Sequence, residues 1–175
     1  IRLSLVGSEM CIRDSDEVLR AVALEISPLI AQRDLDFGIH TEPALVQSHE
    51  WMLRELSRNL LHNAVRHAPP GSELTVDLRS DGRHVALTIS DHGPGIDDEL
   101  AARLFQPFSA GDVRTGSGLG LAICHEIVQA LEGSIALTNR VQGHKVTGLD
   151  AVVRLPLPAP LTDSAPTAQA AQSHP

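Results

Sequence analysis

Two asparagines, Asn59 and Asn63, stand four residues apart in the segment RNLLHNAVRHAP. At that spacing they share one face of a helix, and Arg66 and His67 continue this face one turn later. Asparagine is a mediocre helix former, so two of them on a strongly apolar helix need a reason. An amide oxygen can ligate Mg²⁺ beside substrate phosphates, and an arginine can pair with a phosphate. A solvated polar face explains the segment equally well when it is taken alone.

A second motif, SDHGPGI, occupies residues 90–96. Asp91 closes an alternating apolar segment, and Gly93 and Gly95 allow the backbone to turn tightly beside a ligand. A buried carboxylate at this point can accept a hydrogen bond from an adenine amino group, and a ligand without that donor would leave the acid unpaired at a cost of about 1–3 kcal/mol. A plain turn after a hairpin strand has the same pattern, so the motif alone is weak evidence.

A third motif, TGSGLGLAIC, spans residues 115–124 and places three glycines just before an expected helix. Exposed N–H groups and the positive end of a helix dipole favour a phosphate at such a place. The motif matches neither GxxxxGK[ST] nor a Rossmann turn that follows a strand, which disfavours P-loop and dinucleotide-binding folds.

The periodicity of apolar residues predicts the elements that must position these motifs. From Asp16 onward, apolar residues recur at three- and four-residue steps, as in an amphipathic helix, and Pro28 predicts an early end or a kink in it. The order of elements indicates an α+β domain with a mixed or antiparallel sheet and helices on one face. We expect further helices at 49–67 and 119–131, strands at 35–41, 134–138 and 149–156, and a hairpin formed by 74–79 and 84–90.

Composition narrows the class of protein. The chain has 175 residues, enough for one ordinary domain, and its formal net charge of -8 argues against a nucleic-acid surface. Cys11 and Cys124 form no CxxC pair, and no apolar run approaches the ~20 residues that span a bilayer. We interpret residues 1–15 as a foreign segment that resembles translated adapter sequence, and residues 158–175, rich in Pro, Ala, Ser, Thr and Gln, as a disordered tail.

Taken together, the motifs resemble a known family. They occur in the order N-x₃-N-A, D-x-G-x-G-I, F-x-x-F at Phe105 and Phe108, and G-x-G-L-G-L. This series resembles the N, G1, F and G2 boxes of the histidine kinase ATP-binding domain over roughly residues 16–157. The resemblance implies the Bergerat (GHKL) fold shared with DNA gyrase, a two-layer sandwich with a mixed sheet and helices on one face. Residues 51–69 look most similar to kinases that sense tricarboxylates.

The resemblance also implies roles for individual residues. Asn63 would ligate the Mg²⁺ that bridges the ATP phosphates, with Asn59 assisting, and Arg66 would contact a phosphate. His67 stands where the family often has Tyr, a departure that puts a stacking role in doubt. Asp91 would recognise the adenine amino group. The rest of the ATP site would comprise Gly93, Gly95 and Ile96 around the base, residues 97–117 as a lid anchored by Phe105 and Phe108, and Gly116, Gly118, Leu119 and Gly120 at the phosphates.

The resemblance implies a protein-histidine kinase. Hydrolysing members of the superfamily carry a water-activating Glu one turn before the metal asparagine, whereas this chain has Asn59 there and only Glu55, interpreted as a surface residue, a further turn back. We therefore expect the γ-phosphate of Mg-ATP to pass to a histidine. The parent is expected to be a homodimer in the bacterial inner membrane with this domain in the cytoplasm, and with a cognate response regulator as partner. A non-catalytic nucleotide-binding module, a hydrolysing ATPase and a serine-kinase anti-sigma factor remain alternatives.

The acceptor histidine is expected on a dimerisation domain outside this chain. His49 and His125 each precede a glutamate, but neither continues as H-E-[apolar]-[R/K]-[S/T]-P. We accordingly interpret residues 16–34 as a connecting helix from that missing domain and 35–157 as the catalytic domain, and we expect the fragment to be inactive alone.

Overall fold

The chain forms an open five-stranded sheet covered on one face by helices. The computed structural model describes residues 11–106 and 119–158. The strands are β1 (Cys11–Asp14), β2 (Asp36–Thr41), β3 (Leu45–Ser48), β4 (Glu73–Ser80), β5 (His84–Asp91), β6 (Ser134–Gln142) and β7 (Lys145–Pro156), and the helices are α1 (Ser15–Gln32), α2 (Glu50–His67), α3 (Asp98–Ala101) and α4 (Gly120–Ala130).

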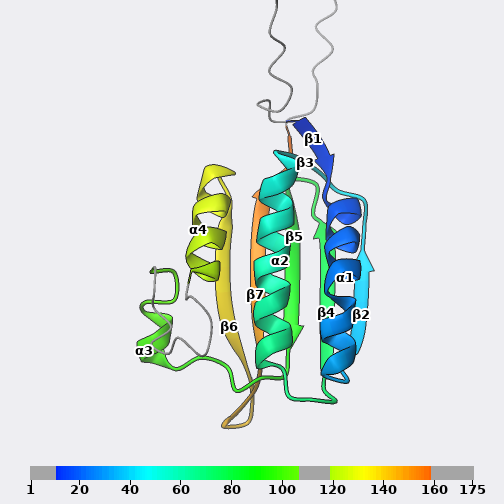
Figure 1. The fold of residues 1–175 in the computed structure, drawn as a ribbon. Coiled ribbons are helices and arrows are strands. Elements are labelled where there is room, and N and C mark those ends of the chain that lie inside the picture. Colours follow the sequence, from blue (N-terminus) through cyan, green and yellow to red (C-terminus); the bar gives the residue numbers. More distant parts are fainter. Residues whose placement is uncertain (1–10, 107–118, 159–175) are drawn as a thin grey trace, which may run out of the picture.

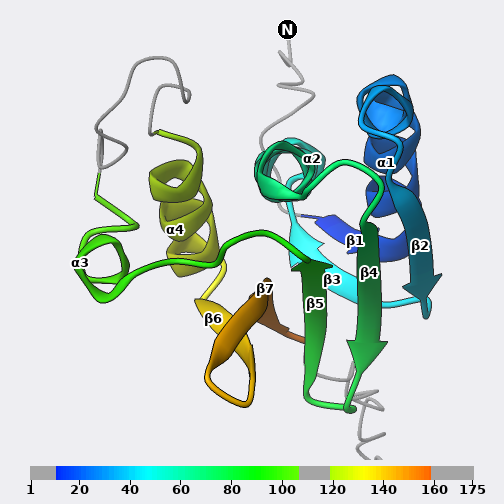
Figure 2. The same cartoon turned by 90° about the horizontal axis from the view of Figure 1, so that it is seen from below.

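The sheet is mixed, as the resemblance implied. Its strand order is β2-β4-β5-β7-β6; β2 and β4 are parallel, and the other neighbours are antiparallel. Helices α1, α2 and α4 lie side by side across one face (Figures 1 and 2). The α+β prediction with helices on one face is therefore confirmed. The small antiparallel sheet of β1 and β3 was not predicted, and neither was α3.

The hydrophobic core lies between the sheet and the helices. In β4 and β5 every second residue is buried, as expected for strands with one covered face. Helix α2 contributes Leu53, Leu56, Leu60 and Leu61 to this core, and α1 contributes Leu19, Val22, Ile26 and Ile30. Helix α1 thus packs into the same core as residues 35–157. Its interpretation as a connection to a dimerisation domain stays a prediction.

Helix α1 runs through Pro28, so the predicted early end is wrong. Proline has no N–H with which to bond the carbonyl four residues earlier, that of Leu24. The Ser27 hydroxyl donates to this carbonyl instead, at 2.9 Å. At its start the helix is capped by Asp14, whose Oδ1 accepts from the Asp16 N–H at 3.0 Å.

The fold brings the predicted site residues toward one end of the sandwich. Strand β5 is central in the sheet and ends at Asp91, on the side where α2 also ends (Figure 1). Residues 92–97 lead from β5 past the end of α2 to α3 (Figure 2). Within the described ranges, no helix combines the length and apolarity that crossing a membrane would require.

Candidate functional site

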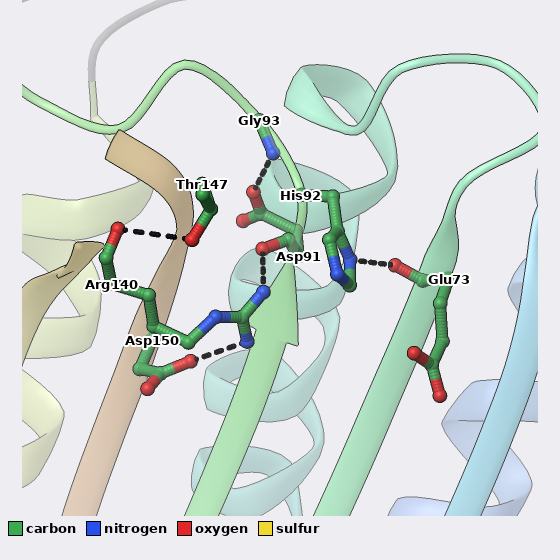
Figure 3. Close-up of polar contacts among 7 residues, drawn as sticks. All are labelled: Glu73, Asp91, His92, Gly93, Arg140, Thr147 and Asp150. Carbon is green, nitrogen blue, oxygen red and sulfur yellow. Dashed lines mark hydrogen bonds and ion pairs between the residues drawn. The ribbon is translucent and has the colours of Figure 1, made fainter. Parts of the chain in front are cut away.

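Asp91 is the most deeply buried charged residue of the site, with 3% of its surface exposed. Its Oδ1 accepts a hydrogen bond from the Gly93 N–H at 2.6 Å (Figure 3). Burial raises the pKa of the Asp91 carboxyl, while the Gly93 hydrogen bond and the nearby His67 and Arg140 act in the opposite direction. The carboxylate is therefore a buried hydrogen-bond acceptor, and its loop fixes one of the two oxygens. Such an acceptor suits recognition of an amino group, which donates hydrogen bonds.

The two glycines of the Asp91 loop are required by their surroundings. A Cβ at Gly93 would lie 2.8 Å from the backbone oxygen of His67 and equally close to Asp91 Oδ1. Gly95 adopts a φ of +75°, where L side chains are strained, and a Cβ there would lie 2.4 Å from Asn139 Oδ1. The loop thus passes the end of α2 and Asn139 at distances that no side chain permits, while the expected approach to a ligand stays a prediction.

Asn59 is held from one side and faces the start of α4 on the other. Its Nδ2 donates to Glu55 Oε1 at 3.0 Å, one turn earlier on α2. A Cβ at Gly120 would lie 3.4 Å from Asn59 Oδ1, so the amide oxygen faces the first residue of α4. The Glu55 carboxylate can only accept hydrogen bonds, so it binds the amide nitrogen of Asn59 and leaves the amide oxygen pointing toward Gly120. The interpretation of Glu55 as a mere surface residue was wrong, because Glu55 is half-buried and orients a site residue.

Asn63 lies one turn beyond Asn59, on the same face of α2. Its side chain is half-buried, and its amide has no hydrogen-bond partner among the residues that the structure describes. The same residues contain no cluster of three or more His, Cys, Asp or Glu that could hold a metal ion. A single free amide oxygen fits Mg²⁺ completed by phosphate oxygens and water, and it does not fit a metal held by protein ligands alone.

The end of α2 is fastened by Arg33. The Arg33 guanidinium donates to the carbonyl oxygens of Val65, at 3.2 Å, and of Arg66, both in the last turn. The side chains of Arg66 and His67 are exposed. Desolvation and the neighbouring Arg66 lower the pKa of the His67 imidazole, in spite of this exposure, and Asp91 partly opposes them. His67 thus lies within electrostatic reach of Asp91.

The segment that carries the buried Asp91, the close glycines and the oriented Asn59 also matches a family of proteins. A family model described as histidine kinase-, DNA gyrase B- and HSP90-like ATPase matches residues 49–159, more than half of the chain. The chain belongs to this ATPase family.

Relatives support the membership. The chain is 31% identical over 155 residues to the swarming motility regulation sensor protein RssA of Serratia marcescens, which covers 86% of the chain and 32% of RssA. Among solved structures it resembles the mycobacterial sensor histidine kinase MprB, with 28% identity and a TM-score of 0.75 over 85% of the chain and 97% of that structure. The chain therefore covers nearly all of that solved sensor histidine kinase structure and spans only about a third of the full-length RssA.

For the other residues predicted for the ATP site, the structure shows fewer contacts or does not describe the residue. Phe105 stacks on His125 of α4, with ring centroids 5.1 Å apart, and its role as a lid anchor stays a prediction. Leu119 is half-buried and begins α4 as its N-cap residue. Phe108, Gly116 and Gly118 lie outside the described residues, and their roles stay predictions.

Three residues that contact predicted site residues were missed from the sequence. Besides Glu55, they are Asn139 and Arg140 on β6, which hydrogen-bond the backbone of the Asp91 loop. One signal existed for Asn139, since asparagine is depleted in strands and an asparagine inside an otherwise β-forming segment needs a partner. The partner itself could not be read from the sequence.

Proposed function

We propose that this domain binds Mg-ATP and presents its γ-phosphate to a histidine of a dimerisation domain outside the chain. The observation that carries the proposal is that α2 approaches the Asp91 loop at His67 and the first residue of α4 at Asn59. These three features supply an acceptor for the base, ligands for the metal–phosphate group and a helix N-terminus for the phosphates.

Adenine recognition is assigned to Asp91. One carboxylate oxygen is occupied by the Gly93 N–H, which leaves the other oxygen to accept from the adenine amino group. A guanine or hypoxanthine base offers a carbonyl oxygen at that position, and two acceptors would then face each other in a buried place. We therefore expect a preference for ATP over inosine triphosphate.

The phosphate end is assigned to α2 and α4. Asn63 would ligate the Mg²⁺ of Mg-ATP through its free amide oxygen, and bound Mg²⁺ would neutralise phosphate charge. Asn59 would assist, with its oxygen fixed toward Gly120 by Glu55. Arg66, Leu119 and Gly120 would lie at the phosphates.

The absence of a general base on this face of α2 favours transfer over hydrolysis. Asn59 carries no proton-accepting carboxylate, and the nearby Glu55 carboxylate is engaged by the Asn59 amide. In the proposed step, an imidazole nitrogen of the acceptor attacks the γ-phosphorus, a P–N bond forms, and the bond to the ADP oxygen breaks. The protein contributes position and charge neutralisation.

The partners follow from the same proposal. The parent would be a homodimer in the bacterial inner membrane with this domain in the cytoplasm, and the phosphoryl group would pass on to a cognate response regulator. A fold neighbour at 22% identity and a TM-score of 0.71, histidine kinase ThkA, was solved in complex with response regulator protein TrrA, which supports a response regulator as partner. A tricarboxylate as the sensed signal stays a prediction.

The proposal is tested by supplying the missing acceptor. The chain is fused behind the dimerisation domain of a related sensor kinase and incubated with γ-³²P-ATP and Mg²⁺. We expect acid-labile label on the acceptor histidine, lost when that histidine becomes Gln and lost in Asn63→Ala. Tight ATP binding without label would indicate a nucleotide-binding module, and steady phosphate release without label would indicate a hydrolysing ATPase.

A further inference from the structure

Two consecutive residues of the edge strand β6, Asn139 and Arg140, hold the two ends of the loop formed by residues 91–96. Strand β6 is separated from β5 by β7, so neither residue is a neighbour of this loop in the sheet order. Their side chains nevertheless reach its backbone, Arg140 at Asp91 and Asn139 at Ile96.

Arg140 fixes the first end of the loop. One guanidinium nitrogen donates to the backbone oxygen of Asp91 at 2.6 Å, and the other donates to Asp150 Oδ1 of β7 at 2.8 Å (Figure 3). Gly148 leaves the room for this arrangement, because a Cβ there would lie 2.1 Å from the Asp91 oxygen and 2.4 Å from Arg140 Nη2. The Arg140 side chain is 30% exposed, so Asp150 orients its guanidinium at a half-buried position.

Asn139 fixes the last residue of the loop. Its Oδ1 accepts from the Ile96 N–H at 2.8 Å, and its Nδ2 donates to the Ile96 carbonyl oxygen at 2.7 Å. The amide therefore satisfies both backbone groups of one residue, as a neighbouring strand would. Gly95, whose absent Cβ would collide with Asn139 Oδ1, lets the loop come this close.

We propose that Asn139 and Arg140 are positioning residues for adenine recognition: they hold loop 91–96 in the shape that aims the Asp91 carboxylate at the base. The inference rests on the proposed ATP binding at Asp91. A loop ordered before the ligand arrives does not lose conformational freedom on binding, which favours affinity. Both side chains contact the loop through its backbone, and neither makes the Gly93 hydrogen bond of the Asp91 carboxylate.

A role in stability alone predicts a different result from a role in positioning. Loss of stability would weaken every nucleotide equally or none. Loss of position at Asp91 would weaken ATP, which offers an amino group, and would leave inosine triphosphate, which does not, nearly unchanged. The ratio of the two affinities is therefore the informative quantity.

The experiment measures Kd for Mg-ATP and Mg-ITP by titration calorimetry on the full 175-residue chain. In Asn139→Ala and Arg140→Met we expect ATP to bind about tenfold more weakly and the ATP/ITP preference to shrink by the same factor. The matched controls are Gln142→Ala, an exposed amide on β6, and Arg154→Met, an exposed arginine on β7, which should leave both affinities unchanged.

The milder variants Asn139→Ser and Arg140→Lys are measured as well, because each keeps part of the hydrogen bonding of the original side chain. Circular dichroism verifies that every variant is folded. A smaller loss of preference in these variants supports positioning. Unchanged ATP binding in all folded variants, or equal losses for ATP and ITP, overturns the inference while the ATP proposal stands. A wild-type chain that binds no ATP overturns both.

Discussion

Replacing Asp91 by asparagine should abolish most of the preference for adenine while keeping the fold. The oxygen of the new side-chain amide keeps the hydrogen bond from the Gly93 N–H, so the amide nitrogen takes the place of the oxygen that faces the base. A donor then meets the adenine amino group, itself a donor. A hydrogen bond to a charged group is worth about 1.5–3 kcal/mol, which corresponds to a loss of about 10- to 150-fold in affinity.

The assay is titration calorimetry with Mg-ATP, and Asp77→Asn is the matched control. Asp77 is a half-buried aspartate of β4 whose carboxylate pairs with Arg79, away from the loop. We expect the control to bind ATP like the wild type. Unchanged ATP affinity in Asp91→Asn, with the variant folded, would refute the assignment of adenine recognition to Asp91.

The same substitution makes a prediction about the unliganded fold. Burial raises the folded-state pKa of Asp91 above its ordinary value of 3.8, so the stability associated with the protonated acid is lost as the pH rises through the folded pKa. An amide lacks this dependence. Asp91→Asn should therefore be at least as stable as the wild type in urea unfolding at neutral pH, and its advantage should shrink as the pH falls toward about 3.8. A lower stability at neutral pH would contradict the reasoning.

Three further changes test other parts of the structure. In Glu55→Gln the Asn59 amide is no longer fixed in one orientation, so we expect the Mg-ATP affinity in calorimetry to fall about three- to tenfold. Unchanged affinity would argue against the orientation of Asn59 by Glu55. Leu19→Ala in α1 should lower the free energy of unfolding in urea by about 2–5 kcal/mol. The control Leu24→Ala, at a residue that is 75% exposed, should change this free energy by no more than about 0.5 kcal/mol. Equal effects of the two substitutions would exclude α1 from the core. Burial raises the pKa of the Cys124 thiol to about 12. In a chain with Cys11→Ser, a thiol reagent should therefore label Cys124 only after unfolding. Rapid labelling of the folded chain would contradict the burial of this thiol.

The sequence predicts well those features that a local pattern determines. Alternation in 74–79 and 84–90 located the β4–β5 hairpin, and the apolar stripe in 49–67 located α2 almost to the residue. Asp91 was expected to be buried at the end of a strand, and the structure confirms this. In each case a repeated spacing in a continuous segment carries the information.

Features that depend on long-range approach could not be predicted. The four-residue strands β1 and β3 are too short for a pattern, and they pair with residues more than thirty positions away. Strand β7 begins at Lys145, ahead of the expected 149, because pairing with β6 continues past the bulge at Arg140 and Val141. The partners of Asn139 and Arg140 depend on where the edge strand meets a loop that precedes it by more than forty residues.

The position of Asp91 explains how a buried carboxylate can be kept at this site. It ends β5, where it pairs with Leu149 of β7, so the sheet sets the start of the loop that Arg140 and Asn139 hold further along. Recognition groups are most precise when rigid elements carry them. The carboxylate then disfavours the empty fold, since burial raises its pKa, and a donor supplied by a ligand can bind the oxygen that Gly93 leaves open. A residue that costs stability in the free protein and gains a partner on binding is what selective recognition of an amino group requires.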